Sequence, residues 1–167
     1  SWKAPYFAVY DDIWQTIHAR NLRIPYQEGF IQQEVLALDE KSCREAVNNA
    51  VAHRDYSIGG RSVIIRSSPD AFTVISPGGF PKDITPENVL EAAPHWRNRL
   101  IAEGFERTKL VERSGQGIDN IFEASIEQGK GLPDFQGTDS NTVRINIPAK
   151  VRDFEFIKFL ERVANEK

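Results

Sequence analysis

The sequence predicts an α/β protein in which helices and strands follow one another along a single domain. Apolar side chains recur at helical spacing in some segments and at every second residue in others, which indicates both kinds of element. Groups of glycine and proline separate these segments. The chain has 167 residues, 40% of them hydrophobic, which is enough for one core but not for two. We therefore expect one domain over residues 1–167.

The N-terminal third predicts a helix, a strand pair and a second helix. Apolar residues at helical spacing indicate the first helix, and alternating apolar runs on either side of Gly29 indicate the strands. Asp39 is placed to accept a hydrogen bond from a free amide of the second helix, as an N-cap does. These elements are expected at residues 7–20, 22–26, 30–38 and 40–54.

The middle of the chain predicts a β-hairpin and then a long irregular segment. β-branched runs at 62–67 and 72–75 flank Ser68-Pro69-Asp70, which is a turn signature. The second strand is expected to stop at the glycine and proline residues of 77–81. Prolines divide residues 82–97 into short pieces, so we expect a loop with short helical turns that acts as a lid.

The C-terminal part predicts two helices, a strand and a final amphipathic helix. Periodic apolar residues indicate the helices, and a β-branched run indicates the strand. A glycine-containing loop at 129–139 precedes the strand. These elements are expected at residues 97–105, 117–128, 142–147 and 151–164.

Composition argues against several classes of protein. The net charge of -3 argues against a surface built mainly to neutralise nucleic-acid phosphates. Cys43 is the only cysteine, so no internal disulfide or cysteine-based zinc cluster is expected. The sequence has no long apolar run and no signal-peptide pattern, so we expect a cytoplasmic protein with no membrane partner. It also lacks methionine, which suggests a fragment whose N-terminal neighbour is missing.

The helix expected at 40–54 carries a polar stripe. Glu45, Asn49 and His53 lie one turn apart and share a face. The oxygen of Asn49 can ligate a hard cation such as Mg²⁺ while Glu45 orients a water toward a phosphate. A solvated helix face gives the same pattern, so this helix alone leaves both interpretations open. His53 is placed to contact a phosphate or Glu45, or to be satisfied by a local hydrogen bond.

Two glycine segments follow this helix in the chain. A strand runs directly into Gly78 and Gly79, which leave the backbone bare enough for a base or a phosphate to approach. Gly115 and Gly117 precede a helix whose free N–H groups can receive phosphates. A turn at a strand end explains the first segment equally well, so the order of the segments carries more information than either one.

Together these segments resemble a known ATPase-like domain. They are similar to the C-terminal domain of bacterial and archaeal transcriptional regulators labelled as related to the C-terminus of the RecG helicase, which belongs to the GHKL superfamily of gyrase, heat-shock chaperone, histidine kinase and MutL proteins. The resemblance covers about residues 7–148. It rests on REAVNNAVAHRDYS at 44–57, ISPGG at 75–79 and RSGQGI at 113–118. It implies a Bergerat-type ATP-binding fold, a two-layer α+β sandwich with helices on one face of a mixed β-sheet.

The resemblance also implies roles for individual residues. Glu45 corresponds to the general base and Asn49 to the Mg²⁺ ligand. The implied ATP-binding residues are Asn49, His53, Ser76, Gly78, Gly79, Gly115, Gly117 and Ile118. Members of the family commonly carry a DNA-binding domain ahead of this one, so DNA would be contacted through the missing N-terminal region. A homodimer is a further possibility that the resemblance leaves open.

Two departures from the family pattern favour an alternative. Ser76 stands where active members have an aspartate that binds the adenine amino group, and Phe80 stands where the last glycine of that segment belongs. Serine accepts a hydrogen bond without a charge, which weakens adenine recognition. The alternative is therefore a catalytically inactive scaffold for dimerisation or partner binding. The chain has no G-x-x-x-x-G-K-[ST] loop, so a helicase motor is not expected.

Overall fold

The computed structural model describes residues 2–81, 83–93, 95–111 and 116–165. Each helix and strand expected from the sequence has a counterpart, with ends that differ by a few residues. The elements are α1 (Tyr6–His18), β1 (Arg23–Glu28), β2 (Ile31–Leu36), α2 (Glu40–Ala52), β3 (Ile64–Ser67), β4 (Ala71–Pro77), α3 (Arg99–Arg107), α4 (Gly117–Glu127), β5 (Thr142–Pro148) and α5 (Phe154–Asn165).

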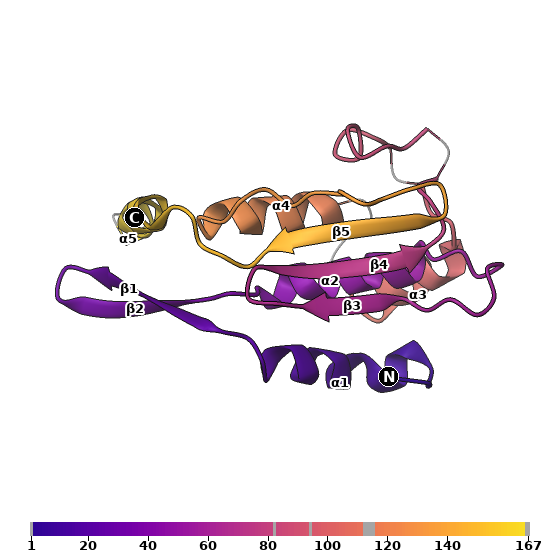
Figure 1. Ribbon diagram of the computed structural model, residues 1–167, viewed down its shortest axis with the longest axis horizontal. Coiled ribbons are helices and arrows are strands. Elements are labelled where there is room, and N and C mark those ends of the chain that lie inside the picture. The colour runs from indigo at the N-terminus through magenta and orange to yellow at the C-terminus, as the bar shows by residue number, and fades with distance from the viewer. Residues whose placement is uncertain (1, 82, 94, 112–115, 166–167) are drawn as a thin grey trace.

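The strands form two antiparallel sheets (Figure 1). β1 pairs with β2 in a hairpin, and β4 lies between β3 and β5 in a three-stranded sheet. The prediction of a mixed sheet is wrong for the described residues, because every pairing between these strands is antiparallel.

The direction of β5 follows from the chain that connects it to β4. After α4, residues 129–139 return along the edge of β5, where Asp134 and Asn146 exchange backbone hydrogen bonds of 3.0 and 2.8 Å. Gly78, just after β4, consequently lies beside Thr142, the first residue of β5. The chain thus enters β5 at the end where it left β4, which makes the two strands antiparallel.

The core lies between the three-stranded sheet and two helices. Phe72 and Val74 on β4 face the same side as their register partners Ile147 and Ile145 on β5, and all four are buried. On the same side, α2 supplies small and medium side chains and α4 supplies Ile121 to one buried cluster. The α2 members are Cys43, Ala46, Val47 and Ala50. Helices therefore cover one face of the sheet, as expected.

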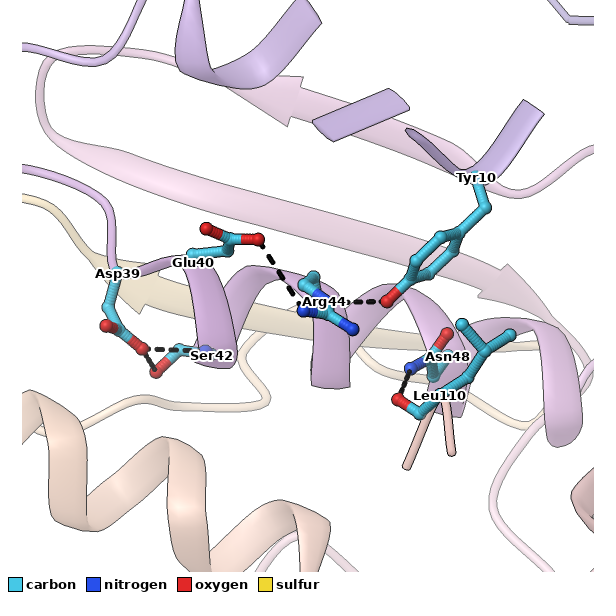
Figure 2. A network of polar contacts seen from close by, with 7 residues as sticks. All are labelled: Tyr10, Asp39, Glu40, Ser42, Arg44, Asn48 and Leu110. Atoms are coloured by element: carbon cyan, nitrogen blue, oxygen red, sulfur yellow. Dashed lines mark hydrogen bonds and ion pairs between the residues drawn. The ribbon is translucent and has the colours of Figure 1, made fainter. Parts of the chain in front are cut away.

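The start of α2 is fixed by the cap that the sequence predicts. The Asp39 carboxylate accepts hydrogen bonds from the backbone N–H and from the hydroxyl of Ser42, both at 2.8 Å (Figure 2). One turn further on, Arg44 pairs with Glu40 at 3.5 Å. The capped first turn fixes where α2 begins and so fixes the direction of the polar stripe further along it.

The β1–β2 hairpin projects to one side of the sheet, next to α5 (Figure 1). The ring of Tyr26 lies 5.9 Å from that of Phe154, which joins the hairpin to α5. Lys130, after α4, donates to the backbone carbonyls of Leu36 and Ala37 at 3.0 and 2.8 Å and fixes the base of the hairpin. No helix in the described part of the chain is both long and apolar enough to cross a membrane.

Candidate nucleotide-binding site

A pocket of about 200 Å³ lies between α2, the end of β4 and the start of α4. This space is more than ten times the roughly 10–15 Å³ that one water molecule needs. All the predicted site residues that the structure describes line it, and Gly115 lies outside the described residues. They are Glu45, Asn49 and His53 from α2 and its C-terminus, Ser76, Gly78 and Gly79 from the end of β4, and Gly117 and Ile118 from α4. Three segments that are far apart in the sequence are thus brought to one pocket.

Much of the pocket wall is apolar and was not assigned from the sequence. Val74 and Ile145 contribute from the sheet, and Phe135 contributes from the segment that returns to β5. The segment expected to form a lid also lines the pocket, through Ile84, Val89, Leu90, Ala92, Ala93, His95 and Trp96, and Phe80 lines it just before this segment. The apolar residues between its prolines are the sequence signal from which this lining could have been inferred. Val89 packs against the core, as does the preceding Phe80, so this segment is anchored to the fold.

Glu45 lies against the first residue of α4. A Cβ atom on Gly117 would collide with the Glu45 carboxylate, so the absence of a side chain at 117 makes room for it. The N-terminus of a helix carries a partial positive charge that favours an anion beside it. The partial positive charge at the start of α4 therefore stabilises the negative charge of the Glu45 carboxylate.

Gly78 and Gly79, which follow β4, lack side chains at points where other groups of the protein lie close to their backbone. Gly78 has a φ of 98°, and a Cβ there would collide with the Arg97 guanidinium and with Asp55. A Cβ on Gly79 would collide with the backbone of Ser140. The sequence interpretation assigned the bare backbone to a ligand, whereas in the structure the space beside both glycines is occupied by other residues.

Arg97 and Asn98 fasten the end of the lid segment to the C-terminus of α2. The guanidinium of Arg97 donates to the Gly79 carbonyl at 2.8 Å and to the His53 carbonyl at 3.3 Å. The side-chain amide of Asn98 donates to the carbonyls of Ala52 and Arg54, at 2.8 and 2.7 Å. The last carbonyls of a helix have no partner within the helix, so these contacts satisfy groups that would otherwise be unpaired.

His53 lies at the same end of α2 and is kept neutral. Burial, together with the nearby charges of Arg97 and His95, lowers the pKa of His53 below its usual value. At pH 7 its ring therefore offers one N–H donor and one acceptor nitrogen to the pocket. The sequence left open whether His53 faces a ligand, and the structure places it on the pocket wall.

Ser76 is buried, with 5% of its surface exposed, and its hydroxyl is oriented by the protein. The Oγ atom donates to the Ala50 carbonyl at 2.7 Å. Because the only proton of the hydroxyl is used there, Ser76 offers only lone pairs to the pocket. A ligand at this position must therefore present a hydrogen-bond donor.

Asn49 holds the one buried polar atom on the described pocket wall that lacks a partner. Its Nδ2 atom is inaccessible to solvent and makes no hydrogen bond with the described residues. A half-turn of the carboxamide exchanges nitrogen and oxygen, so the group can meet either a donor or an acceptor. An unpaired amide here fits a site that is completed by a ligand.

The described lining carries negative but no permanent positive side chains. Glu45 and Asp119 are the acidic members, and neither lysine nor arginine is among the lining residues that the structure describes. The described residues also contain no group of three or more His, Cys, Asp or Glu side chains placed to hold a metal. A cation at this site would consequently need ligands from a bound molecule as well as from the protein.

The fold is similar to that of a longer bacterial protein. It superposes on the crystal structure of the DIP2311 protein from Corynebacterium diphtheriae, a structural-genomics target, with a TM-score of 0.81 and 27% identity over 90% of this chain. The match covers 31% of the other chain, so this chain spans about a third of that protein's length. A search of curated proteins gave no match.

A family model identifies the chain by its sequence. The match covers residues 60–147, which are more than half of the 167 residues and include β3, β4, α3, α4 and β5. α2, with Glu45 and Asn49, precedes the matched region. The chain therefore belongs to the family of ATPase-like domains described as "Putative ATP-dependent DNA helicase recG C-terminal".

Proposed function

We propose that this chain is an ATP-binding domain of the GHKL superfamily, with a Bergerat-type fold, that binds ATP together with Mg²⁺ and hydrolyses it slowly. The observation that carries the proposal is the pocket itself, where the polar stripe of α2 meets the end of β4 and the start of α4. Family membership supports an ATPase-like domain. The roles of the individual residues follow from the chemistry of the pocket wall.

The apolar part of the pocket is suited to a nucleobase. Val74, Ile145 and Phe135 offer the mainly apolar wall that small-molecule sites share. Ser76, which can only accept, would receive a hydrogen bond from the exocyclic amino group of adenine. Guanine carries a carbonyl at the corresponding ring position, which cannot donate, so this arrangement favours adenine over guanine.

The polar part of the pocket is suited to phosphates. The N-terminus of α4, at Gly117 and Ile118, would receive them at its free N–H groups. Asn49 would hold Mg²⁺ through its amide oxygen, with phosphate oxygens and water as the other ligands. A bound Mg²⁺ would supply the positive charge that neutralises the phosphates. Because no lysine or arginine is found on the described lining, we expect ATP binding to depend strongly on Mg²⁺.

Hydrolysis would depend on Glu45. Its carboxylate lies beside the start of α4, so it is close to where the phosphates would bind. In this position it would orient a water molecule and accept its proton, as a general base does. The neutral ring of His53 would donate a hydrogen bond to a phosphate oxygen from the same wall.

In the complete protein, we propose that this single domain regulates a DNA-binding domain that precedes it. A longer relative of similar fold supports a multidomain arrangement. ATP binding would then change the state of the attached domain, in the cytoplasm and with no membrane partner. A homodimer is the simplest assembly in which such a change would reach two DNA half-sites.

Calorimetry with ATP, ADP and GTP, each with and without Mg²⁺, tests the proposal directly. We expect binding of Mg²⁺-ATP, weaker binding of ATP when EDTA is present, and much weaker binding of GTP. GTP binding as tight as ATP binding would contradict the role of Ser76. Absence of binding by any of the three would contradict the proposal as a whole.

Two observations favour a second candidate, a scaffold that has kept the fold without the activity. Ser76 brings no charge to the base end of the pocket. The spaces beside Gly78 and Gly79 are already filled by Arg97, Asp55 and Ser140. A scaffold of this kind would bind no nucleotide and would still form a dimer, which analytical ultracentrifugation would detect.

A further inference from the structure

Asn48 is the most deeply buried polar side chain near the pocket, and its two polar atoms face opposite ways. It is 1% exposed. Its Oδ1 accepts a hydrogen bond from the Tyr6 hydroxyl at 2.6 Å. Its Nδ2 donates to the Leu110 carbonyl at 3.0 Å (Figure 2). A buried amide with both ends engaged in this way joins the backbone of one segment to the side chain of another.

The Tyr6 end of this link belongs to α1. The Tyr6 ring packs against Phe105 on α3, with 5.3 Å between centroids. Burial raises the pKa of the Tyr6 hydroxyl, so it remains a donor throughout the physiological range. The hydrogen bond to Asn48 therefore forms only when α1 is docked on α2 and α3.

The Leu110 end of this link belongs to the pocket. Leu110 follows α3, its amide donates to the Phe105 carbonyl at 2.9 Å, and the next residue, Val111, lines the pocket. α4 begins a few residues later at Gly117, against Glu45. The position of the Leu110 backbone thus helps to set the position of Val111 on the pocket wall.

We propose that Asn48 is a positioning residue that couples the docking of α1 to the pocket wall at Val111. The part of this inference that concerns ATP rests on the proposed function. When α1 is docked, Tyr6 holds the Asn48 carboxamide in the orientation that binds Leu110. When α1 is displaced, Asn48 loses this partner and the Leu110 backbone gains freedom. The state of α1, and of any domain that pulls on it, is thereby transmitted to ATP affinity.

The test compares Tyr6→Phe with Tyr10→Phe. Tyr10 is one turn further along α1, and its hydroxyl accepts a hydrogen bond from Arg44 instead of contacting Asn48 (Figure 2). Each variant removes one hydroxyl from the same helix. Because Tyr6→Phe also leaves the buried Asn48 oxygen without a donor, the free energy of unfolding is measured for both variants and the exchange rates are compared after allowing for any difference. Only Tyr6→Phe breaks the link to Leu110.

Two readouts are measured on both variants and the parent. The first is hydrogen exchange, without nucleotide, at the amide of Leu110, which is bonded to the Phe105 carbonyl. The second is the dissociation constant for Mg²⁺-ATP. For Tyr6→Phe we expect faster exchange at the Leu110 amide and affinity lowered about 2- to 10-fold, as the loss of one hydrogen bond would give. For Tyr10→Phe we expect neither change.

The outcomes separate the coupling from the proposed function. Faster exchange in Tyr6→Phe alone supports the coupling even if the parent binds no ATP, a result that would overturn only the proposed function. Equal exchange at Leu110 in the two variants overturns the coupling. Equal losses of ATP affinity also overturn it, because they would reflect general destabilisation.

Discussion

The Glu45 carboxylate rests against Gly117, in a space that exists only because residue 117 has no side chain. An alanine at this position should be well tolerated by α4, because alanine is favoured over glycine in a helix by about 1 kcal/mol. It should nevertheless displace Glu45. We therefore expect Gly117→Ala to keep or raise the free energy of unfolding while lowering ATP turnover at least about tenfold.

Gly104→Ala is the matched control for this change. Gly104 lies within α3, and a Cβ there would meet no atom within 4 Å. Urea denaturation and steady-state turnover on both variants make the comparison. Normal turnover in Gly117→Ala would show that Glu45 is not required in its present position.

Substitutions of Glu45 and Asn49 should impair different steps, hydrolysis in the first case and Mg²⁺-dependent binding in the second. Loss of Glu45 in Glu45→Ala should leave Mg²⁺-ATP affinity nearly unchanged and lower turnover by about two to four orders of magnitude, as expected for a general base. Asn49→Ala should weaken Mg²⁺-dependent binding itself, since it removes the proposed ligand. Calorimetry and phosphate release are measured on both variants. Equal loss of binding in the two folded variants would mean that these roles are assigned wrongly.

Asn98 should control the opening of the lid segment. In Asn98→Ala the carbonyls of Ala52 and Arg54 lose their donor, which should cost about 1–3 kcal/mol of unfolding free energy. Hydrogen exchange in residues 83–93 should accelerate by a larger factor than in β4 and β5. Arg99→Ala, which breaks only an exposed pair with Glu103, is the control and should cost less than about 1 kcal/mol. If hydrogen exchange accelerated by the same factor throughout the chain, Asn98 would not act locally on the lid segment.

His53 should make stability depend on pH. Its pKa is lowered in the folded chain, whereas in the unfolded chain it lies near its usual value of about 6.5. As the pH falls through this value, the unfolded state takes up a proton that the folded state resists, so the folded state loses stability. Between about pH 7.5 and 5.5, the loss should be greater in the parent than in His53→Gln. Identical losses in urea titrations of the two proteins would show that His53 does not titrate in this way.

Local sequence signals predicted the elements and the composition of the site, but they could not predict how its parts fit together. Asp39 and the apolar spacing after it located α2, and the N-cap is confirmed. The meeting of α2, β4 and α4 was expected from the order of the segments, through a family resemblance. By contrast, the occupant of the space beside Gly78 depends on Arg97, which is distant in the chain and reaches it only through tertiary packing.

Strand direction was missed for a similar reason. The mixed sheet came from the family resemblance, and nothing between residues 129 and 139 marks a path along the edge of β5. That path depends on backbone hydrogen bonds between Asp134 and Asn146, which any pair of residues can make. The lid lining was partly visible as apolar residues between prolines, whereas its attachment through Asn98 to the last carbonyls of α2 was not.

The close packing of Arg97 on Gly78 has a consequence for how sequences of this kind can diverge. The guanidinium occupies the volume that a methyl group at residue 78 would need. A shorter residue at 97 would not by itself admit alanine at 78, because the φ of 98° and the nearby Asp55 side chain would still disfavour a Cβ atom there. Glycine should therefore persist at residue 78 among descendants even where residue 97 varies.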